Sequence, residues 1–186
     1  MICWRSLAIR MRRRWCGCHR RDVRIARLYN ARMSRHIILF AHNIRSLWNI
    51  GALFRSCDCF AVEKLILSGY TATPPRREIA KTALGADEWI PWEKVENPQS
   101  AIQQLSNEGW KIVALEQSKR SIALQEYSPP EKTCLIVGHE VLGVPEEILK
   151  LCDDVVHIPM LGKKKSLNVS VAAGIALHHL RSYNHD

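Results

Sequence analysis

A chain of 186 residues, 47% of them hydrophobic, can bury one sizeable core, so we expect one domain with a short appendage. It contains no run of 18 or more apolar residues, and we therefore expect a soluble protein without a membrane-spanning helix. The net charge of +9 suggests a nucleic-acid partner, but its distribution is uneven. Residues 1–35 hold eleven arginines and one acid, whereas the other residues hold 16 basic and 17 acidic side chains. The total charge therefore says little about the partner of the remaining chain.

Seven cysteines, an odd number, show no CxxC pair and no regular framework, which favours reduced thiols in a cytoplasmic compartment. Cys16-Gly17-Cys18-His19 could be considered as a metal site. No second ligand cluster follows it at the spacing of a zinc finger, so we expect no bound metal.

Residues 1–33 are rich in arginine and read as a basic tail, which leaves residues 34–186 as the folded domain. Three interpretations of the tail remain open: an arm that contacts RNA, a transit segment for an organelle, or an upstream extension that is not translated from the true start. The position of Met33, directly before the first predicted strand, favours the third.

Short apolar runs alternate with helical segments from Ser34 onward. In chain order, the pattern predicts a strand at 37–40, a helix at 49–60, a strand at 64–67, a short helix from Pro74 and Pro75 to Leu84, an extended piece at 89–92, a helix at 98–107, strands at 110–115 and 133–137, a helix at 145–151, a strand at 155–158 and a helix at 167–183. This alternation predicts an α/β fold, a mostly parallel sheet with helices on both faces. Because ligands bind beyond the carboxyl ends of parallel strands, residues 42–55, 138–143 and 159–168 are where we expect the chemistry.

The first of these segments contains Asn49, a predicted helix N-cap, and Arg55 within an otherwise apolar stretch. A buried or half-buried arginine needs a partner. Asp58 or Glu63 could provide one as an ion pair. Alternatively, the guanidinium reaches a phosphate or a reacting oxygen at the carboxyl edge of the sheet.

The second segment is a glycine-containing loop between a strand and a helix that Pro145 begins. We expect Gly138 and Gly143 to let the backbone approach a ligand closely. Glu140 could be a simple loop acid, a cap for the amides of Gly143 or Val144, or a ligand contact.

The third segment leads into the last predicted helix, and Ser166 and Asn168 are residue types that cap helices. A free helix N-terminus also favours a carboxylate or a phosphate. The lysines 163–165 ahead of this turn would ordinarily form a solvated loop, but their position also allows contact with an RNA phosphate.

Together, the patterns N-x-G-x-x-x-R, G-x-E-x-x-G-V-P and I-P-M-x-G-(x)-S-L-N-V-S-V-A resemble the three motifs of the SpoU/TrmH branch of the SPOUT methyltransferases. The resemblance covers about residues 36–183. It implies a carboxyl-terminal trefoil knot, an exception to the rule that chains do not thread loops, and a homodimer. It also implies S-adenosylmethionine-dependent methylation of a ribose 2'-hydroxyl in RNA, with tRNA as the first expectation and rRNA as the second.

The resemblance further implies roles for individual residues. The methyl donor would be held by Leu115, Glu116, Val137, Gly138, Glu140, Gly143, Ile158, Met160, Ser166 and Leu167. The catalytic set would be Arg55, Asn49, Glu140, Ser166 and Asn168, in which Arg55 matches the arginine that promotes deprotonation of the ribose hydroxyl. RNA contacts would come from Arg45, Arg55, Lys163, Lys164 and Lys165.

Methyl transfer from a sulfonium requires an oxygen nucleophile in line with the methyl group and a route for its proton, but no metal. The pKa of arginine lies above 12, so Arg55 would act through an RNA phosphate or by stabilising the developing alkoxide. The sequence departs from the family pattern at His139, where Gln or Asn is common, and at the triple lysine. These departures could change substrate choice.

Three other functions are weaker interpretations. A knotted RNA-binding protein without catalysis would have no chemical need for all the matched polar residues. A base-methylating SPOUT enzyme fits less well, because the Asn49/Arg55 and Ser166-Leu167-Asn168 sets favour ribose. A nicotinamide-dependent enzyme would need a glycine fingerprint that is missing.

Overall fold

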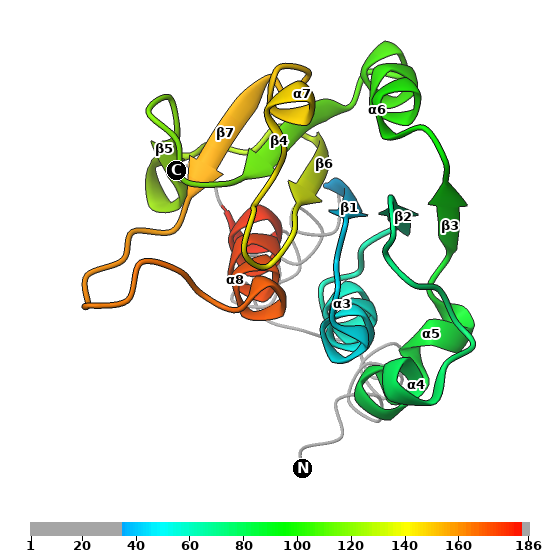
Figure 1. Ribbon diagram of the computed structural model, residues 1–186. Helices are drawn as coiled ribbons and strands as arrows, with labels where there is room; N and C mark the ends of the chain where they lie inside the picture. The colour runs from blue at the N-terminus through cyan, green and yellow to red at the C-terminus, as the bar shows by residue number, and fades with distance from the viewer. Residues whose placement is uncertain (1–34, 184–186) are drawn as a thin grey trace, which may run out of the picture. The chain divides into compact units, whose positions relative to one another are not determined.

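The computed structural model describes residues 35–183, and the arginine-rich segment 1–33 lies outside the described residues. Seven strands in this part of the chain form one sheet in which all paired strands are parallel, in the order β3-β2-β1-β6-β4-β7-β5 (Figure 1). The strands are β1 (His36–His42), β2 (Lys64–Ser68), β3 (Trp92–Val95), β4 (Lys111–Leu115), β5 (Ile122–Ala123), β6 (Lys132–Val137) and β7 (Asp154–His157).

Helices cover both faces of this sheet (Figure 1). The described helical elements are α3 (Leu47–Cys59), α4 (Arg77–Ala83), α5 (Ala86–Trp89), α6 (Pro98–Asn107), the short 3-10 helix η1 (Leu124–Glu126), α7 (Glu146–Leu149) and α8 (Val169–Ser182). Residues of α3, α4, α5 and α8 share one hydrophobic cluster, and residues of α6 and α7 share another.

Strand β1 contributes side chains to both hydrophobic clusters, because its successive residues point to opposite faces of the sheet. Ile37, Leu39 and Ala41 belong to the α3/α8 side, whereas Ile38 and Phe40 belong to the α6/α7 side. Successive side chains of a strand point to opposite faces, so a strand that is buried on both faces reads as a continuous apolar run. The predicted α/β fold with a mostly parallel sheet and helices on both faces is confirmed, while the trefoil knot stays a prediction.

The predicted elements are largely where the sequence placed them, and the errors fall on short elements, including α5 and η1, which were not predicted. The helix at 98–107 is confirmed in full, with Asn97 accepting a hydrogen bond from the Ser100 backbone N–H as its N-cap. The extended piece at 89–92 is wrong, because Trp89 ends the short helix α5 and the strand begins only at Trp92. The edge strand β5 was missed because two residues are too short to show a period.

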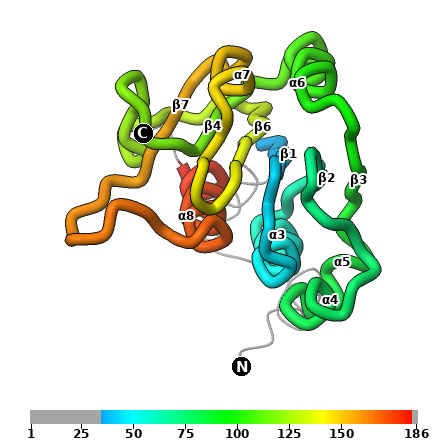
Figure 2. The backbone as a smooth tube through the Cα atoms, in the orientation of Figure 1, coloured from blue at the N-terminus to red at the C-terminus, as the bar shows by residue number. Residues whose placement is uncertain are grey.

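The strand order decides which loops meet. Strands β1, β6, β4 and β7 are neighbours in the sheet and run in the same direction. The segments 43–46, 116–121, 138–145 and 158–168 therefore all leave the same carboxyl edge, and Figure 2 shows the last two as the yellow tube after β6 and the orange tube between β7 and α8. Four segments widely separated in sequence are brought to one edge of the sheet.

Among residues 35–183, no helix is both long and apolar enough to cross a membrane. No group of three or more His, Cys, Asp or Glu side chains could hold a metal ion there, and Cys16-Gly17-Cys18-His19 falls outside the range.

Candidate active site

A pocket opens at the carboxyl ends of β4, β6 and β7, against the first turn of α8. Its walls include apolar side chains, backbone groups and carboxylates. All ten residues predicted to hold the methyl donor line it: Leu115, Glu116, Val137, Gly138, Glu140, Gly143, Ile158, Met160, Ser166 and Leu167. The structure thus brings the predicted donor residues together, although their role in binding stays a prediction.

Glu140 joins the loop after β6 to the start of α3. Its Oε1 accepts hydrogen bonds from the Ser46 backbone N–H at 3.0 Å and from Asn49 Nδ2 at 2.9 Å. Its Oε2 accepts from the Arg45 backbone N–H at 3.1 Å. The expectation that Glu140 could cap the amides of Gly143 or Val144 is wrong, because its carboxylate is occupied by α3 and the segment before it.

These bonds set the ionisation of Glu140. Burial alone would raise its pKa, but the hydrogen bonds from the backbone of Ser46 and Arg45 and from the Asn49 side chain stabilise the carboxylate and lower the pKa from its ordinary value. The positive end of the α3 dipole lies at the same place. Glu140 is therefore held as an anion at neutral pH.

Asn168 continues this network to the third segment. Its Nδ2 donates to Asn49 Oδ1 at 3.1 Å, and its Oδ1 accepts from the Ser170 backbone N–H at 2.9 Å as the N-cap of α8. The capping role predicted for Asn168 is confirmed. Ser166 does not cap the helix, and it lines the pocket as an exposed residue instead. Glu140, Asn49 and Asn168 form one hydrogen-bonded chain across the three motifs.

The predicted N-cap at Asn49 is wrong. The helix α3 begins at Leu47, and Ser46 is its N-cap, accepting from the Asn49 backbone N–H at 3.4 Å. Asn49 lies inside the first turn and is 8% exposed. Because its amide group both donates to Glu140 and accepts from Asn168, its burial leaves neither polar atom unpaired.

The glycines of the second segment make room for the protein's own chain. A Cβ atom at Gly138 would lie 2.3 Å from the carbonyl oxygen of Gly143, and one at Gly143 would lie 2.0 Å from Glu116 Oε2. Glu116 Oε2 in turn accepts from the Val144 backbone N–H at 2.9 Å. Gly138 and Gly143 thus let the loop close tightly on itself, and because both also line the pocket, their close approach to a ligand stays a prediction.

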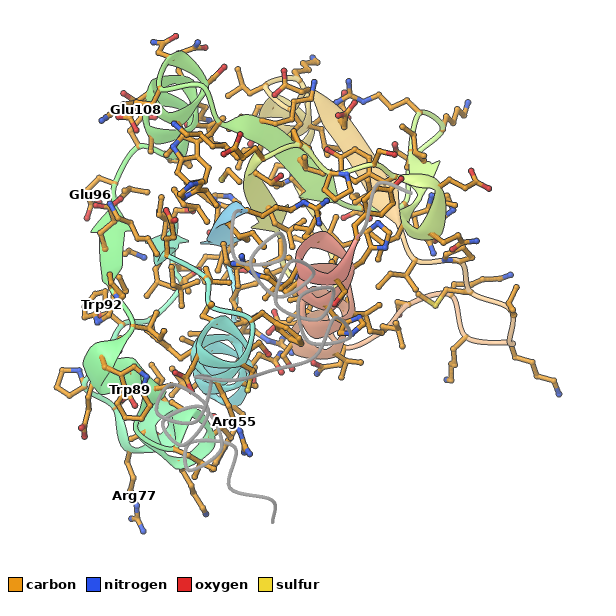
Figure 3. The ribbon with its side chains drawn as sticks, turned by 180° about the vertical axis from the view of Figure 1, so that it is seen from behind. Arg55, Arg77, Trp89, Trp92, Glu96 and Glu108 are labelled. Atoms are coloured by element: carbon orange, nitrogen blue, oxygen red, sulfur yellow. The ribbon has the colours of Figure 1, made fainter. Side chains whose placement is uncertain are left out.

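Arg55 lies apart from this network. The prediction that it is buried or half-buried is wrong, because its side chain is exposed on α3 and points outward in Figure 3. Within residues 35–183 it has no hydrogen bond or ion pair: Asp58 accepts from Trp89 Nε1 at 2.8 Å, and Glu63 binds His36. The ion pair considered as an alternative therefore does not form.

Arg55 also lies outside the donor pocket. It lines a separate shallow hollow between α3 and α4, together with Lys81 and Thr82. The structure accordingly assembles four of the five predicted catalytic residues at or beside the pocket, namely Asn49, Glu140, Ser166 and Asn168, and leaves Arg55 facing solvent.

The predicted RNA contacts are exposed cations. Arg45 lies in the loop after β1, and Lys163, Lys164 and Lys165 belong to the long segment between β7 and α8 that extends away from the sheet in Figure 1. Of these four residues, Lys165 also lines the pocket. Their exposure is compatible with phosphate contacts.

Sequence reasoning missed several residues of the pocket. Gln117 and His157 line it beside residues that were predicted, and Val169 and Ala172 line it from the first turn of α8. Gln117 lies in the loop after β4 and His157 ends β7, and each could have been found by extending the predicted set by one residue. Val169 and Ala172 required knowledge of how α8 is turned toward the sheet.

Comparison with known sequences identifies relatives of this chain. The sequence model of the SpoU rRNA Methylase family matches residues 36–178. A curated relative, the tRNA (guanosine(18)-2'-O)-methyltransferase of Aquifex aeolicus, is 39% identical over 145 residues. That match covers 77% of this chain and 68% of the relative.

Solved structures agree with this similarity. The crystal structure of the A. aeolicus TrmH/SpoU tRNA modifying enzyme is similar with a TM-score of 0.73 and 34% identity, covering 86% of this chain and 83% of that one. An AdoMet-bound rRNA methyltransferase from Sinorhizobium meliloti has a TM-score of 0.74 and 25% identity, covering 78% of this chain and 56% of that one.

Proposed function

Because the chain belongs to the SpoU rRNA methylase family, we propose that it transfers the methyl group of S-adenosylmethionine to a ribose 2'-hydroxyl of RNA, with tRNA as its substrate. The observation that carries this proposal is the pocket that gathers all ten predicted donor residues, joined to the chain Glu140–Asn49–Asn168. The name of the A. aeolicus relative supports tRNA over rRNA as the substrate.

The pocket residues fit the proposed donor. Leu115, Val137, Ile158 and Leu167 offer apolar walls for a flat base, and the backbone at the ends of β4, β6 and β7 offers hydrogen-bonding groups. When bound, S-adenosylmethionine supplies an electrophilic methyl group on a sulfonium sulfur. The carboxylates of Glu116 and Glu140 add negative charge to the walls of the pocket, which suits a cationic donor.

In the proposed reaction, the ribose 2'-oxygen forms a bond to the methyl carbon, the sulfur–carbon bond breaks, and the hydroxyl proton departs. The guanidinium of Arg55 stays protonated, so it stabilises the developing alkoxide or orients a phosphate of the RNA that takes the proton. Arg55 is exposed and has no hydrogen bond or ion pair with residues 35–183, which supports this role because the guanidinium is available to an RNA substrate. Glu140 and Asn168 would act by holding the loops and Asn49 in place.

We also propose that the chain acts as a homodimer. Val171 and Ile175 are 50% and 42% exposed and lie one turn apart on α8, so they form an apolar stripe on one side of the helix, and Leu167, 39% exposed, precedes its N-cap. Exposed apolar stripes of this kind mark interaction surfaces. Light scattering of the unaltered chain and of Val171→Asp should give the mass of a dimer for the first and of a monomer for the second.

Two proposals concern residues 1–33 and the compartment. We propose that the folded domain, residues 34–186, carries the activity by itself, and that it works in the cytoplasm. The four cysteines among residues 35–183 are free, which supports a reducing compartment. A shortened chain that starts at Met33 should then transfer methyl groups as the full chain does.

The test is methyl transfer from labelled S-adenosylmethionine to total tRNA and, separately, to rRNA, by the full chain and by the chain that starts at Met33. Nucleoside analysis of the product gives the methylated atom. A 2'-O-methylated nucleoside from tRNA supports the proposal, and a methylated base would instead identify a base-methylating enzyme. Absence of transfer together with absence of donor binding by calorimetry would identify an RNA-binding protein without catalysis.

A further inference from the structure

Tyr70 is an exposed aromatic side chain beside the donor pocket. It follows β2 at the carboxyl edge of the sheet and is 57% exposed. Its ring and the ring of His139 form a T-shaped pair, with the ring centroids 6.1 Å apart and the planes at 80°. His139 itself lines the donor pocket. A large apolar surface therefore faces solvent beside the place where the methyl group would be transferred.

The loop that carries Tyr70 is braced without using its ring. The Tyr70 backbone N–H donates to Asn43 Oδ1 at 3.1 Å. Lys94 Nζ donates to the carbonyl oxygens on either side of Tyr70, at 2.7 Å for Thr71 and at short range for Gly69. Gly69 has a φ of +62° and packs directly on Asn43, where a Cβ atom would not fit. The exposed ring is thus presented by a fixed backbone.

His139 is fixed as well. Its Nδ1 accepts hydrogen bonds from the backbone N–H groups of Val141 at 2.8 Å and Leu142 at 3.1 Å. Its own backbone exchanges two hydrogen bonds with Gly143, at 3.0 and 2.9 Å. An Nδ1 that accepts places the ring proton on Nε2. The rings of Tyr70 and His139 are therefore both held in place before any ligand binds.

This pair of fixed rings could bind a nucleobase by stacking. A base taken out of its stack finds a flat partner in an exposed tyrosine, and a ring already held in place loses little entropy on binding. Arg45 lies two residues after Asn43, which binds the Tyr70 backbone, and its exposed side chain offers a cation on the same loop for a phosphate of the RNA. His139 occupies the position where Gln or Asn is common in the resembled family.

We propose that Tyr70 is an RNA-contacting residue on which an unstacked base of the substrate lies, with His139 holding the tyrosine ring through their T-shaped contact. This proposal rests on the proposed function for the RNA substrate, and it adds a specific contact to it. Stacking on an aromatic ring tolerates any base, so Tyr70 contributes affinity for an unpaired nucleotide rather than recognition of one base.

The test compares Tyr70→Ala, Tyr70→Phe and Tyr70→Leu with the unaltered chain in filter binding to unmodified tRNA transcripts at fixed salt. Tyr70→Ala should weaken tRNA affinity about tenfold or more and raise KM for tRNA with little change in kcat. Tyr70→Phe should keep the affinity, and Tyr70→Leu, with similar bulk but no ring, should lose most of it. Ile122→Ala, which removes an exposed apolar side chain from the edge strand β5, should behave as the unaltered chain.

A second measurement uses the same transcripts with 5-iodouridine in place of uridine. Irradiation should cross-link them to Tyr70, as mass spectrometry of the peptides would show, and the cross-link should disappear in Tyr70→Leu. Affinity of Tyr70→Ala for S-adenosylmethionine, by calorimetry, should equal that of the unaltered chain.

Normal tRNA affinity of Tyr70→Ala would overturn the proposal, as would equal affinity of Tyr70→Leu and Tyr70→Phe. A change in molecular mass of Tyr70→Ala in light scattering would overturn it too, because the ring would then belong to a contact between protein chains. The binding experiment does not need turnover. An unaltered chain that binds tRNA through Tyr70 but transfers no methyl group would refute the proposed function and leave the stacking contact standing.

Discussion

Two residues of the same helix, Asn49 and Arg55, have opposite surroundings. Asn49 is 8% exposed and is hydrogen-bonded to Glu140 on one side and Asn168 on the other. Arg55 is exposed and has no hydrogen bond to any residue from 35 to 183. Six residues of helix turn the side chain by about 120° around the axis, so the two cannot share a face.

This difference indicates two roles within one motif, a structural role for Asn49 and the proposed catalytic role for Arg55. The Asn49 end of α3 joins the loops after β1, β6 and β7 through hydrogen bonds. Removing these bonds should lower the free energy of unfolding and change the shape of the pocket. The Arg55 side chain makes no hydrogen bond or ion pair with residues 35–183, so its loss should change the reaction and leave stability unaltered. Substitutions on the two sides therefore test whether this separation is real.

The largest effect is expected at Arg55. Arg55→Ala should lower kcat for methyl transfer to tRNA by about a hundredfold or more, the scale of one lost oxyanion-type contact. Its urea midpoint and its affinity for S-adenosylmethionine should equal those of the unaltered chain. Arg77→Ala, which removes an exposed arginine from the neighbouring helix α4 (Figure 3), is the matched control and should keep full activity. Normal turnover by Arg55→Ala would show that the motif arginine has no catalytic role.

Glu140→Ala should have the largest effect on stability. The substitution leaves two backbone N–H groups and the Asn49 amide without their acceptor, which costs about 1–3 kcal/mol in the free energy of unfolding. Urea unfolding measures this cost, and donor affinity should fall with it. The exposed Glu131 just before β6 gives the control variant Glu131→Ala, which should unfold at the same urea concentration as the unaltered chain. Equal stability of the two variants would mean that the Glu140 network does not tie the loops.

Asn168 allows its two hydrogen-bonding roles to be separated. Asn168→Ala removes the N-cap of α8 and the bond to Asn49, and should cost about 1 kcal/mol of stability. Asn168→Asp keeps an acceptor for the Ser170 N–H but cannot donate to Asn49 Oδ1 when ionised. Asn168→Asp should recover the stability that the N-cap contributes but not the affinity for S-adenosylmethionine. Recovery of both in Asn168→Asp would show that the link to Asn49 is unimportant.

The smallest effect is the pH dependence of the Glu140 contribution. Its pKa is lower in the folded chain than its ordinary value of 4.5. The stabilisation is therefore complete above that ordinary value and is lost as the pH falls through the lowered pKa of the folded state. The difference in free energy of unfolding between the unaltered chain and Glu140→Gln should be constant from pH 7 to about pH 5 and shrink below that range. A difference that grew on acidification would contradict the hydrogen-bonded carboxylate.

Local signals in the sequence determined most of the secondary structure. Pro98 after Asn97 marks the start of α6, and Asn168 marks the start of α8, because a proline and a capping side chain act within a single turn. Continuous apolar runs gave the central strands for the same local reason. The prediction from sequence failed at the short elements α5 and β5, because four and two residues are too few to show a hydrophobic period.

The motif positions in the sequence also determined which residues meet in the pocket, since residues that follow parallel strands must gather at one edge of a sheet. Only the tertiary structure decided what each polar side chain does there. The Glu140 carboxylate accepts a hydrogen bond from Asn49 of α3, which lies 91 residues earlier in the chain. The Arg55 side chain is exposed to solvent although its neighbours in the sequence are apolar. Hydrogen-bond partners and exposure depend on how distant segments pack, and no local pattern contains that information.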